Sequence, residues 1–144
     1  GIRVDGIDSS PTAIAQAQQA ARNAEVDDRV VFRVGSGLDL PYPDARFNAA
    51  FDRGFFHHVP EDEYPRYFRE VPRVLKPRGW LSLHAFTLRN SPGIGHRFSA
   101  DDIARIFAPF FSLEERSEDP WPTDAPAHLG HYLLCARSER TAVA

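Results

Sequence analysis

Residues 1–11 read GIRVDGIDSSP, and this stretch joins a strand pattern to the start of a helix. Apolar side chains recur through the first seven positions, which favours a strand that ends near Asp8. Ser10 is a preferred N-cap residue, and Pro11 suits the first helical position because the N–H that it lacks needs no partner there. The stretch therefore predicts a strand, a tight turn and a helix.

The rest of the chain continues this alternation. We expect a helix over 11–23, strands over 29–34 and 47–52, a helix over 64–75, a strand over 80–86, a short helix opened by Ser99 and Asp102, and strands over 111–115 and 130–137. Pro72 lies inside the second helix and predicts a kink or a break near residues 69–72.

Alternating strands and helices with short connections favour a Rossmann-like α/β fold, with a mainly parallel sheet and helices on both faces. The last two strands have no helix between them, so they should form an antiparallel pair at one edge of the sheet. We predict one domain over residues 1–138 and a frayed tail over 139–144.

Composition argues against several classes of protein. The single cysteine, Cys135, excludes a disulfide framework and suits a reducing cytosol. No apolar run approaches the ~20 residues that cross a bilayer, and no targeting segment is recognisable. The net charge of -3, with acidic and basic residues interspersed, offers no basic face for phosphates. We expect a cytoplasmic protein that binds neither nucleic acid nor membranes.

Candidate binding residues follow the strands, because ligands of open α/β sheets bind beyond the carboxyl ends of the strands. Asp8 has two acceptor oxygens that suit a ribose diol, although an aspartate before Ser10 can equally serve a helix cap. The sequence GSGL at 35–38 predicts a small turn against which a base could lie. DRGFFHHVP at 52–60 gathers charged groups, a glycine and aromatic residues in one turn.

Taken in order, these motifs resemble those of the class I S-adenosylmethionine (SAM) dependent methyltransferases, from Val4 to about Arg137. The similar stretches are GIDSS at 6–10, LDLPYPDARFNAAFD at 38–52, HHVP at 57–60 and EVPRVLKPRG at 70–79. Within the family, residues 52–54 and 91–98 look more loosely like the small-molecule branch related to thiopurine methyltransferases.

The resemblance implies that the chain transfers a methyl group from SAM to a nucleophilic atom of a small-molecule acceptor. Asp8 and Ser9 would bind the ribose, Ser36, Gly37 and Leu38 would border the adenine, and Asp52, Arg53 and Gly54 would border the methionine end. The chain departs from the family pattern at Ser36, where aspartate is usual, and at Arg78, where glycine is usual.

The resemblance also implies that a first strand and its glycine-rich SAM loop are missing from residues 1–144. In the family this strand is central, so we expect the 144-residue chain alone to be poorly stable, because buried contacts and hydrogen bonds are lost with the strand.

The histidines favour a pocket more than a metal centre. His57 and His58 are adjacent and lack a third ligand at metal spacing, so we expect them to be structural or to line the acceptor pocket, with no metal bound. His96 and Trp121 are further candidates for that pocket, and His84 should be packed inside its strand. Methyl transfer from a sulfonium depends mainly on alignment of the acceptor, so no catalytic base is assigned.

Two alternative functions stay open at this level. A nicotinamide-dependent oxidoreductase would use Asp8 on its ribose in the same way, although the motifs at 57–60 and 70–79 disfavour it. A non-catalytic methyltransferase-like fragment or subunit is the other alternative.

Overall fold

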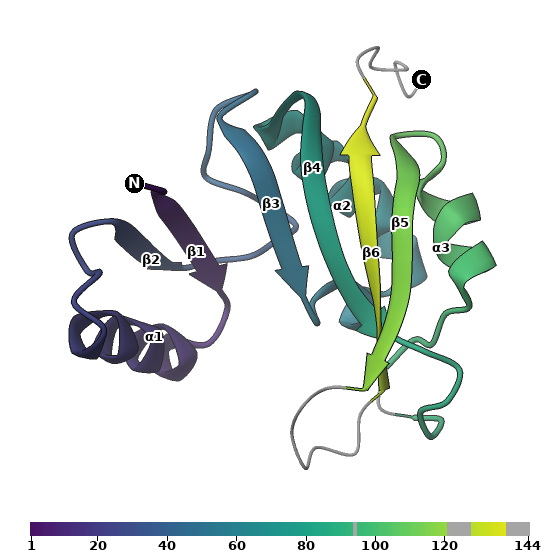
Figure 1. The fold of residues 1–144 in the computed structure, drawn as a ribbon, viewed down its shortest axis with the longest axis horizontal. Helices are drawn as coiled ribbons and strands as arrows, with labels where there is room; N and C mark the ends of the chain where they lie inside the picture. Colours follow the sequence, from purple (N-terminus) through teal and green to yellow (C-terminus); the bar gives the residue numbers. More distant parts are fainter. Residues whose placement is uncertain (94, 121–127, 138–144) are drawn as a thin grey trace. The chain divides into compact units, whose positions relative to one another are not determined.

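The computed structural model describes residues 1–93, 95–120 and 128–137, in two compact units that meet at Pro41 and Tyr42 (Figure 1). The elements are β1 (Val4–Asp8), α1 (Pro11–Asn23), β2 (Val30–Val34), β3 (Phe47–Arg53), η1 (Phe56–His58), η2 (Glu61–Glu63), α2 (Tyr64–Val74), β4 (Leu75–Phe86), α3 (Ala100–Phe107), β5 (Phe111–Pro120) and β6 (His128–Ala136). The expected tail over 139–144 lies outside the described residues.

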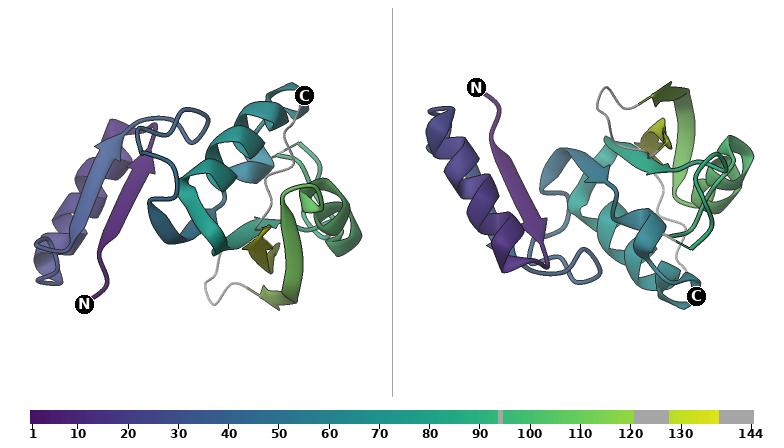
Figure 2. Two further views of the ribbon diagram at one scale, coloured as in Figure 1. Left: turned by 90° about the horizontal axis from the view of Figure 1, so that it is seen from above. Right: turned by 90° about the horizontal axis from the view of Figure 1, so that it is seen from below.

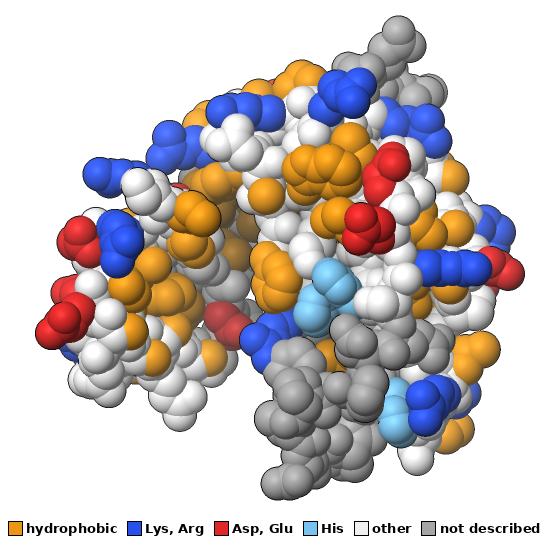
Figure 3. Space-filling model, viewed as in Figure 1, with side chains coloured by type: hydrophobic (Ala, Val, Ile, Leu, Met, Phe, Trp, Pro, Cys, Tyr) orange, Lys and Arg blue, Asp and Glu red, His pale blue; other side chains and the backbone are white. Residues whose placement is uncertain are grey.

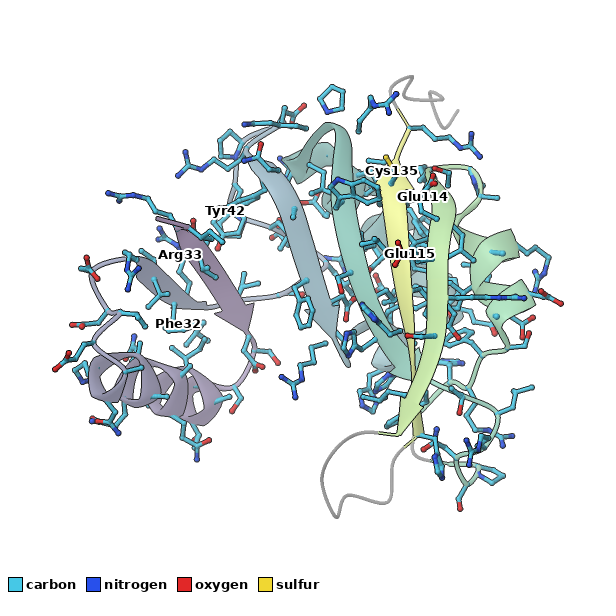
Figure 4. All side chains as sticks on the ribbon, viewed as in Figure 1. Phe32, Arg33, Tyr42, Glu114, Glu115 and Cys135 are labelled. Atoms are coloured by element: carbon cyan, nitrogen blue, oxygen red, sulfur yellow. The ribbon has the colours of Figure 1, made fainter. Side chains whose placement is uncertain are left out.

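The first unit is the βαβ unit that the sequence predicts. β1 and β2 pair in parallel, and α1 starts at the Ser10 cap, whose hydroxyl accepts from the Ala13 N–H at 3.2 Å. Phe32 on β2 points toward α1 (Figure 4). A Cβ on Gly6 would lie 2.6 Å from the Phe32 ring, so the glycine makes room for this core side chain.

The second unit is a four-stranded mixed sheet in the order β3-β4-β6-β5. β3 and β4 are parallel, whereas β6 runs antiparallel to both β4 and β5. The expected antiparallel pair is confirmed, but a mainly parallel sheet is wrong for the described residues. β6 follows β5 without an intervening helix and inserts between β5 and β4, so antiparallel pairs are as frequent as parallel ones.

Both helices of the second unit lie on one face of this sheet (Figure 2). The Phe68 ring of α2 contacts the Phe107 ring of α3, with 4.9 Å between centroids, over the buried side chains of Leu81 and Leu83. Within the described residues, the expectation of helices on both faces is therefore not met. Figure 3 views the opposite face, where hydrophobic side chains reach the surface, and Phe51 is 62% exposed.

Two local expectations have different outcomes. The Ser99 and Asp102 capping box is confirmed, since the Asp102 N–H donates to the Ser99 hydroxyl and the Ser99 N–H donates to Asp102. Helix α2, however, is not broken at Pro72. The proline lies two residues before the helix ends, where a missing hydrogen bond disturbs little of the helix that follows.

Strand β4 begins earlier than the sequence pattern predicts. Its pairing with β3 jumps from Phe47 opposite Leu75 to Ala49 opposite Trp80, so residues 76–79 bulge out between the two paired positions. In this bulge Arg78 has a φ of 60°, the left-handed conformation that glycine adopts without strain.

Candidate active site

The carboxyl ends of β1 and β2 lie side by side in the first unit, because Asp8 pairs with Val34 in the parallel register. Asp8 is exposed, and its Oδ1 accepts from the Ser10 N–H at 2.7 Å. Within the described residues no hydrogen bond engages its other carboxylate oxygen. Asp8 therefore supports the turn into α1 and still presents an acceptor oxygen to solvent, so the two roles considered for it are compatible.

The turn after β2 is shaped by Ser36, whose hydroxyl oxygen accepts from the Leu38 N–H at 3.1 Å. The Ser36 carbonyl accepts from the Asp39 N–H at 3.2 Å, which closes a small loop around Gly37. Gly35 joins this turn to β1, because its N–H donates to the Asp8 carbonyl at 2.9 Å. The residues expected at the ribose and the adenine, Asp8, Ser9, Ser36, Gly37 and Leu38, thus share one end of one small sheet.

In the second unit, Asp52 ends β3 with its side chain turned into the protein. Its Oδ1 accepts from the N–H groups of Phe55 and Phe56, and its Oδ2 accepts from the Tyr67 hydroxyl at 2.9 Å. Burial raises the pKa of Asp52, against the lowering effect of these three hydrogen bonds. The carboxylate shapes the turn, which leaves exposed Arg53 and half-buried Gly54 as the residues able to border a ligand there.

His57 is almost completely buried, with 3% of its surface exposed. Its ring stacks on Phe86 with 3.7 Å between centroids, and its Nδ1 accepts from the Phe86 N–H at 3.2 Å. Burial, with a smaller effect of His58, lowers the pKa of His57 to about 4. His57 is therefore a neutral, immobilised imidazole at neutral pH.

The other candidate pocket residues lie around this histidine. The His58 ring packs edge-on against His57, with 4.4 Å between centroids, and the His96 N–H donates to the His57 carbonyl at 2.7 Å. The fold therefore brings together three of the four residues expected to line the acceptor pocket. The fourth, Trp121, lies outside the described residues.

His84 is half-buried on the sheet face that α2 and α3 leave open, where its ring packs against that of Phe51 with 5.0 Å between centroids. Its ring lies 4.5 Å from that of His131, which pairs with the Ser82 hydroxyl at 2.9 Å. Among the described residues, no group of three or more His, Cys, Asp or Glu side chains is arranged to bind a metal ion.

Sequence reasoning missed two residues that position the turn at 52–60. Tyr67 has the spacing of a core residue on an amphipathic helix, and nothing in that pattern indicates a hydroxyl bonded to Asp52. Phe86 likewise has only the pattern of a strand residue, although both its ring and its N–H hold His57. Among the described residues, no helix is both long enough and apolar enough to cross a lipid bilayer.

Comparison with curated proteins finds enzymes that methylate small molecules. The chain is 40% identical over 91 residues to 27-O-demethylrifamycin SV methyltransferase of Amycolatopsis mediterranei. These residues are 63% of the chain and 33% of that enzyme. It is 32% identical over 90 residues to norajmaline N-methyltransferase of Rauvolfia serpentina, covering 62% of the chain and 30% of that enzyme. The chain thus spans about a third of the length of these relatives.

Solved structures share the fold. A SAM-dependent methyltransferase from Methanosarcina mazei superposes with a TM-score of 0.77 at 23% identity, over 94% of this chain and 82% of that one. The 1,6-didemethyltoxoflavin-N1-methyltransferase of Burkholderia thailandensis gives a TM-score of 0.74 at 24% identity, over 94% and 61%. A family model described as a methyltransferase domain matches residues 1–83, which include β1 through most of β4. The chain therefore belongs to the methyltransferase domain family of SAM-dependent enzymes.

Proposed function

We propose that the protein transfers a methyl group from SAM to a nucleophilic O, N, S or C atom of a small-molecule acceptor. The observation that carries this proposal is the paired strand end of β1 and β2, where Asp8 keeps an acceptor oxygen beside the Ser36 turn. Membership of the methyltransferase family favours this function over a nicotinamide-dependent oxidoreductase.

The residues at this strand end suit the adenosine part of SAM. The Asp8 carboxylate can accept from ribose hydroxyls, with Ser9 beside it, and the Ser36 hydroxyl keeps its proton for donation because its oxygen accepts from the Leu38 N–H. Gly37 and Leu38 would border the adenine ring. SAM would supply a methyl group on a sulfonium, and the chain's own contribution would be to hold donor and acceptor in line.

The methionine end of SAM is assigned to Arg53 and Gly54. The Asp52 carboxylate is taken up by Phe55, Phe56 and Tyr67, so we propose that it acts through the shape of the turn and does not bind the cofactor directly.

A glycine-rich strand beyond these 144 residues is part of the proposal. In the described residues β1 pairs only with β2, and β3 pairs only with β4, so each has one edge without a partner strand. An unpaired strand edge leaves backbone N–H and C=O groups without ladder partners, and a further strand paired with β1 or with β3 would satisfy them.

The proposed acceptor is a small natural product, because the relatives are named as methyltransferases of 27-O-demethylrifamycin SV and norajmaline. His57, His58 and His96 would line its pocket, together with Trp121. His96 belongs to residues 91–98, which are loosely similar to the thiopurine methyltransferase branch. We propose that these residues contribute to the acceptor pocket.

The test is calorimetric titration of SAM and S-adenosylhomocysteine into the chain and into a version extended upstream. We expect Asp8→Ala to weaken binding about 10-fold or more, because at least one hydrogen bond to a charged acceptor is lost. Asp27→Ala is the control, since Asp27 is also exposed but lies in the turn after α1.

Methyl transfer to 27-O-demethylrifamycin SV and other natural products would then be measured with radiolabelled SAM. Binding of the cofactor by neither protein would contradict the proposal and favour a non-catalytic methyltransferase-like subunit.

A further inference from the structure

The two ring nitrogens of His57 have different surroundings. Nδ1 accepts a hydrogen bond from the Phe86 main-chain N–H, so it cannot carry a proton itself. A neutral imidazole bears one proton, which must then be on Nε2. Stacking on Phe86 prevents the ring from turning to exchange the two nitrogens. The main chain of β4 thereby selects one tautomer of a buried histidine.

The Nε2 atom has no hydrogen-bond partner among the described residues. The ring edge that carries it faces Gly54, in the turn that ends β3: a Cβ built on Gly54 would lie 3.4 Å from Cε1 and 3.7 Å from Nε2. Gly54 adopts a φ of 87°, which other residues rarely adopt, so this side of the ring is kept clear of a side chain. Nε2 is not one of the fully buried atoms of the described residues, so its N–H can reach a ligand atom on this side of the ring.

We propose that His57 donates its Nε2–H to an oxygen atom of a ligand held beside Gly54. This inference rests on the proposed function, and the oxygen belongs either to the carboxylate of the cofactor's methionine end or to the methyl acceptor. In both cases a lone pair of the ligand oxygen accepts a hydrogen bond from the fixed, uncharged Nε2–H group of His57. His57 is in this view a residue that binds and orients the ligand.

A role for His57 as general base is incompatible with this geometry. A base needs a free lone pair toward its substrate, whereas Nδ1 is occupied by Phe86 and Nε2 holds the proton. The low pKa of His57, which results from burial and from neighbouring His58, keeps the ring neutral and its donor geometry constant near neutral pH. A purely structural role would require only the Phe86 contacts and would leave the second nitrogen unused.

The tautomer is tested by NMR on the version extended upstream, labelled with ¹⁵N-histidine. We expect the nitrogen shifts of His57 to be those of a neutral ring protonated at Nε2. Addition of S-adenosylhomocysteine, or of 27-O-demethylrifamycin SV with it, should shift the Nε2 signal and slow exchange of its proton. A ring protonated at Nδ1, or an Nε2 signal that ignores both ligands, would overturn the inference while the proposed function stands.

Two substitutions distinguish the roles of the two ring nitrogens of His57. His57→Asn keeps an acceptor near the Nδ1 position for Phe86 but removes the outward donor, whereas His57→Gln can keep an N–H donor near the Nε2 position. We expect His57→Asn to weaken ligand binding about 3- to 10-fold more than His57→Gln, as loss of one hydrogen bond predicts.

The affected ligand identifies the source of the oxygen. Weaker binding of S-adenosylhomocysteine assigns the oxygen to the cofactor, and a raised KM for the acceptor with unchanged cofactor binding assigns it to the acceptor. Equal effects of both variants on both ligands would overturn the inference. Wild-type protein that binds no S-adenosylhomocysteine, even when extended upstream, would contradict the proposed function itself and this inference with it.

Discussion

At the scale of single residues, Arg78 has a strained backbone conformation at a position where glycine is usual in the similar family. Its φ of 60° is unfavourable for a side chain with a Cβ, by roughly 1–2 kcal/mol, and the family pattern has glycine there. We expect Arg78→Gly to raise the free energy of unfolding by about 0.5–1 kcal/mol, since the entropy of glycine in the unfolded chain offsets part of the relief.

Urea denaturation of the version extended upstream, which should unfold cooperatively, would measure this change. Arg89→Gly is the matched control, because Arg89 is also exposed but has an ordinary negative φ, and it should not gain stability. Equal effects of the two substitutions would contradict a conformational origin.

A second residue-scale prediction concerns the acid sensitivity of His57. Its pKa falls from 6.5 in the unfolded chain to about 4 in the folded protein, so the unfolded chain binds more protons between these values. The free energy of unfolding should therefore decrease as pH falls from about 6.5 to 4, and this loss should be smaller in His57→Gln. Unfolding of the version extended upstream by urea at pH 7, 6 and 5 would check this, and parallel pH dependences of the two proteins would contradict it.

At the scale of elements, helix α3 depends on its cap. Ser99 and Asp102 satisfy each other's N–H groups at its first turn, and the helix buries Ile103 and Phe107 against the sheet. We expect Ser99→Ala to lower the free energy of unfolding by about 1 kcal/mol, measured by urea denaturation of the version extended upstream. Ser91→Ala, in an exposed loop position, should change it by less than about 0.5 kcal/mol.

Helix α2 is tied to residues that come before β3 and to a residue near the end of β3. Its Tyr67 hydroxyl holds Asp52, and its Arg73 guanidinium donates to the Tyr42 carbonyl and pairs with Asp44 and buried Glu70. These contacts explain why α2 tolerates Pro72, since its position is determined by packing and side-chain bonds more than by its last hydrogen bonds.

At the scale of the whole molecule, the open face of the four-stranded sheet exposes large apolar side chains. Phe51 is 62% exposed and Trp80 is 41% exposed, on a sheet whose parallel β3 and β4 would ordinarily be covered on both faces. We expect the 144-residue chain to bind the dye ANS and to melt over a broad range without a sharp transition.

The double substitution Phe51→Ser and Trp80→Ser should reduce ANS fluorescence, whereas Leu88→Ser, which removes an exposed side chain outside the sheet, should leave it nearly unchanged. A sharp, cooperative calorimetric transition of the wild-type chain with little dye binding would contradict this expectation.

The order and type of the elements could be predicted from the sequence, since periodicity and caps act within a few residues. The sequence also placed Asp8 and Ser36 at strand ends, because such positions follow directly from where a strand pattern stops. The insertion of β6 between β4 and β5, which makes the sheet mixed, depends on packing between distant elements and became visible only in the folded chain.

Tertiary structure likewise decided how the turn at 52–60 is used. Asp52 turns inward because Tyr67 meets it across 15 residues, and His57 has one fixed tautomer because Phe86 meets it across 29. Such contacts depend on packing between elements, which no local pattern encodes, so the chemistry of these side chains became visible only in the folded chain.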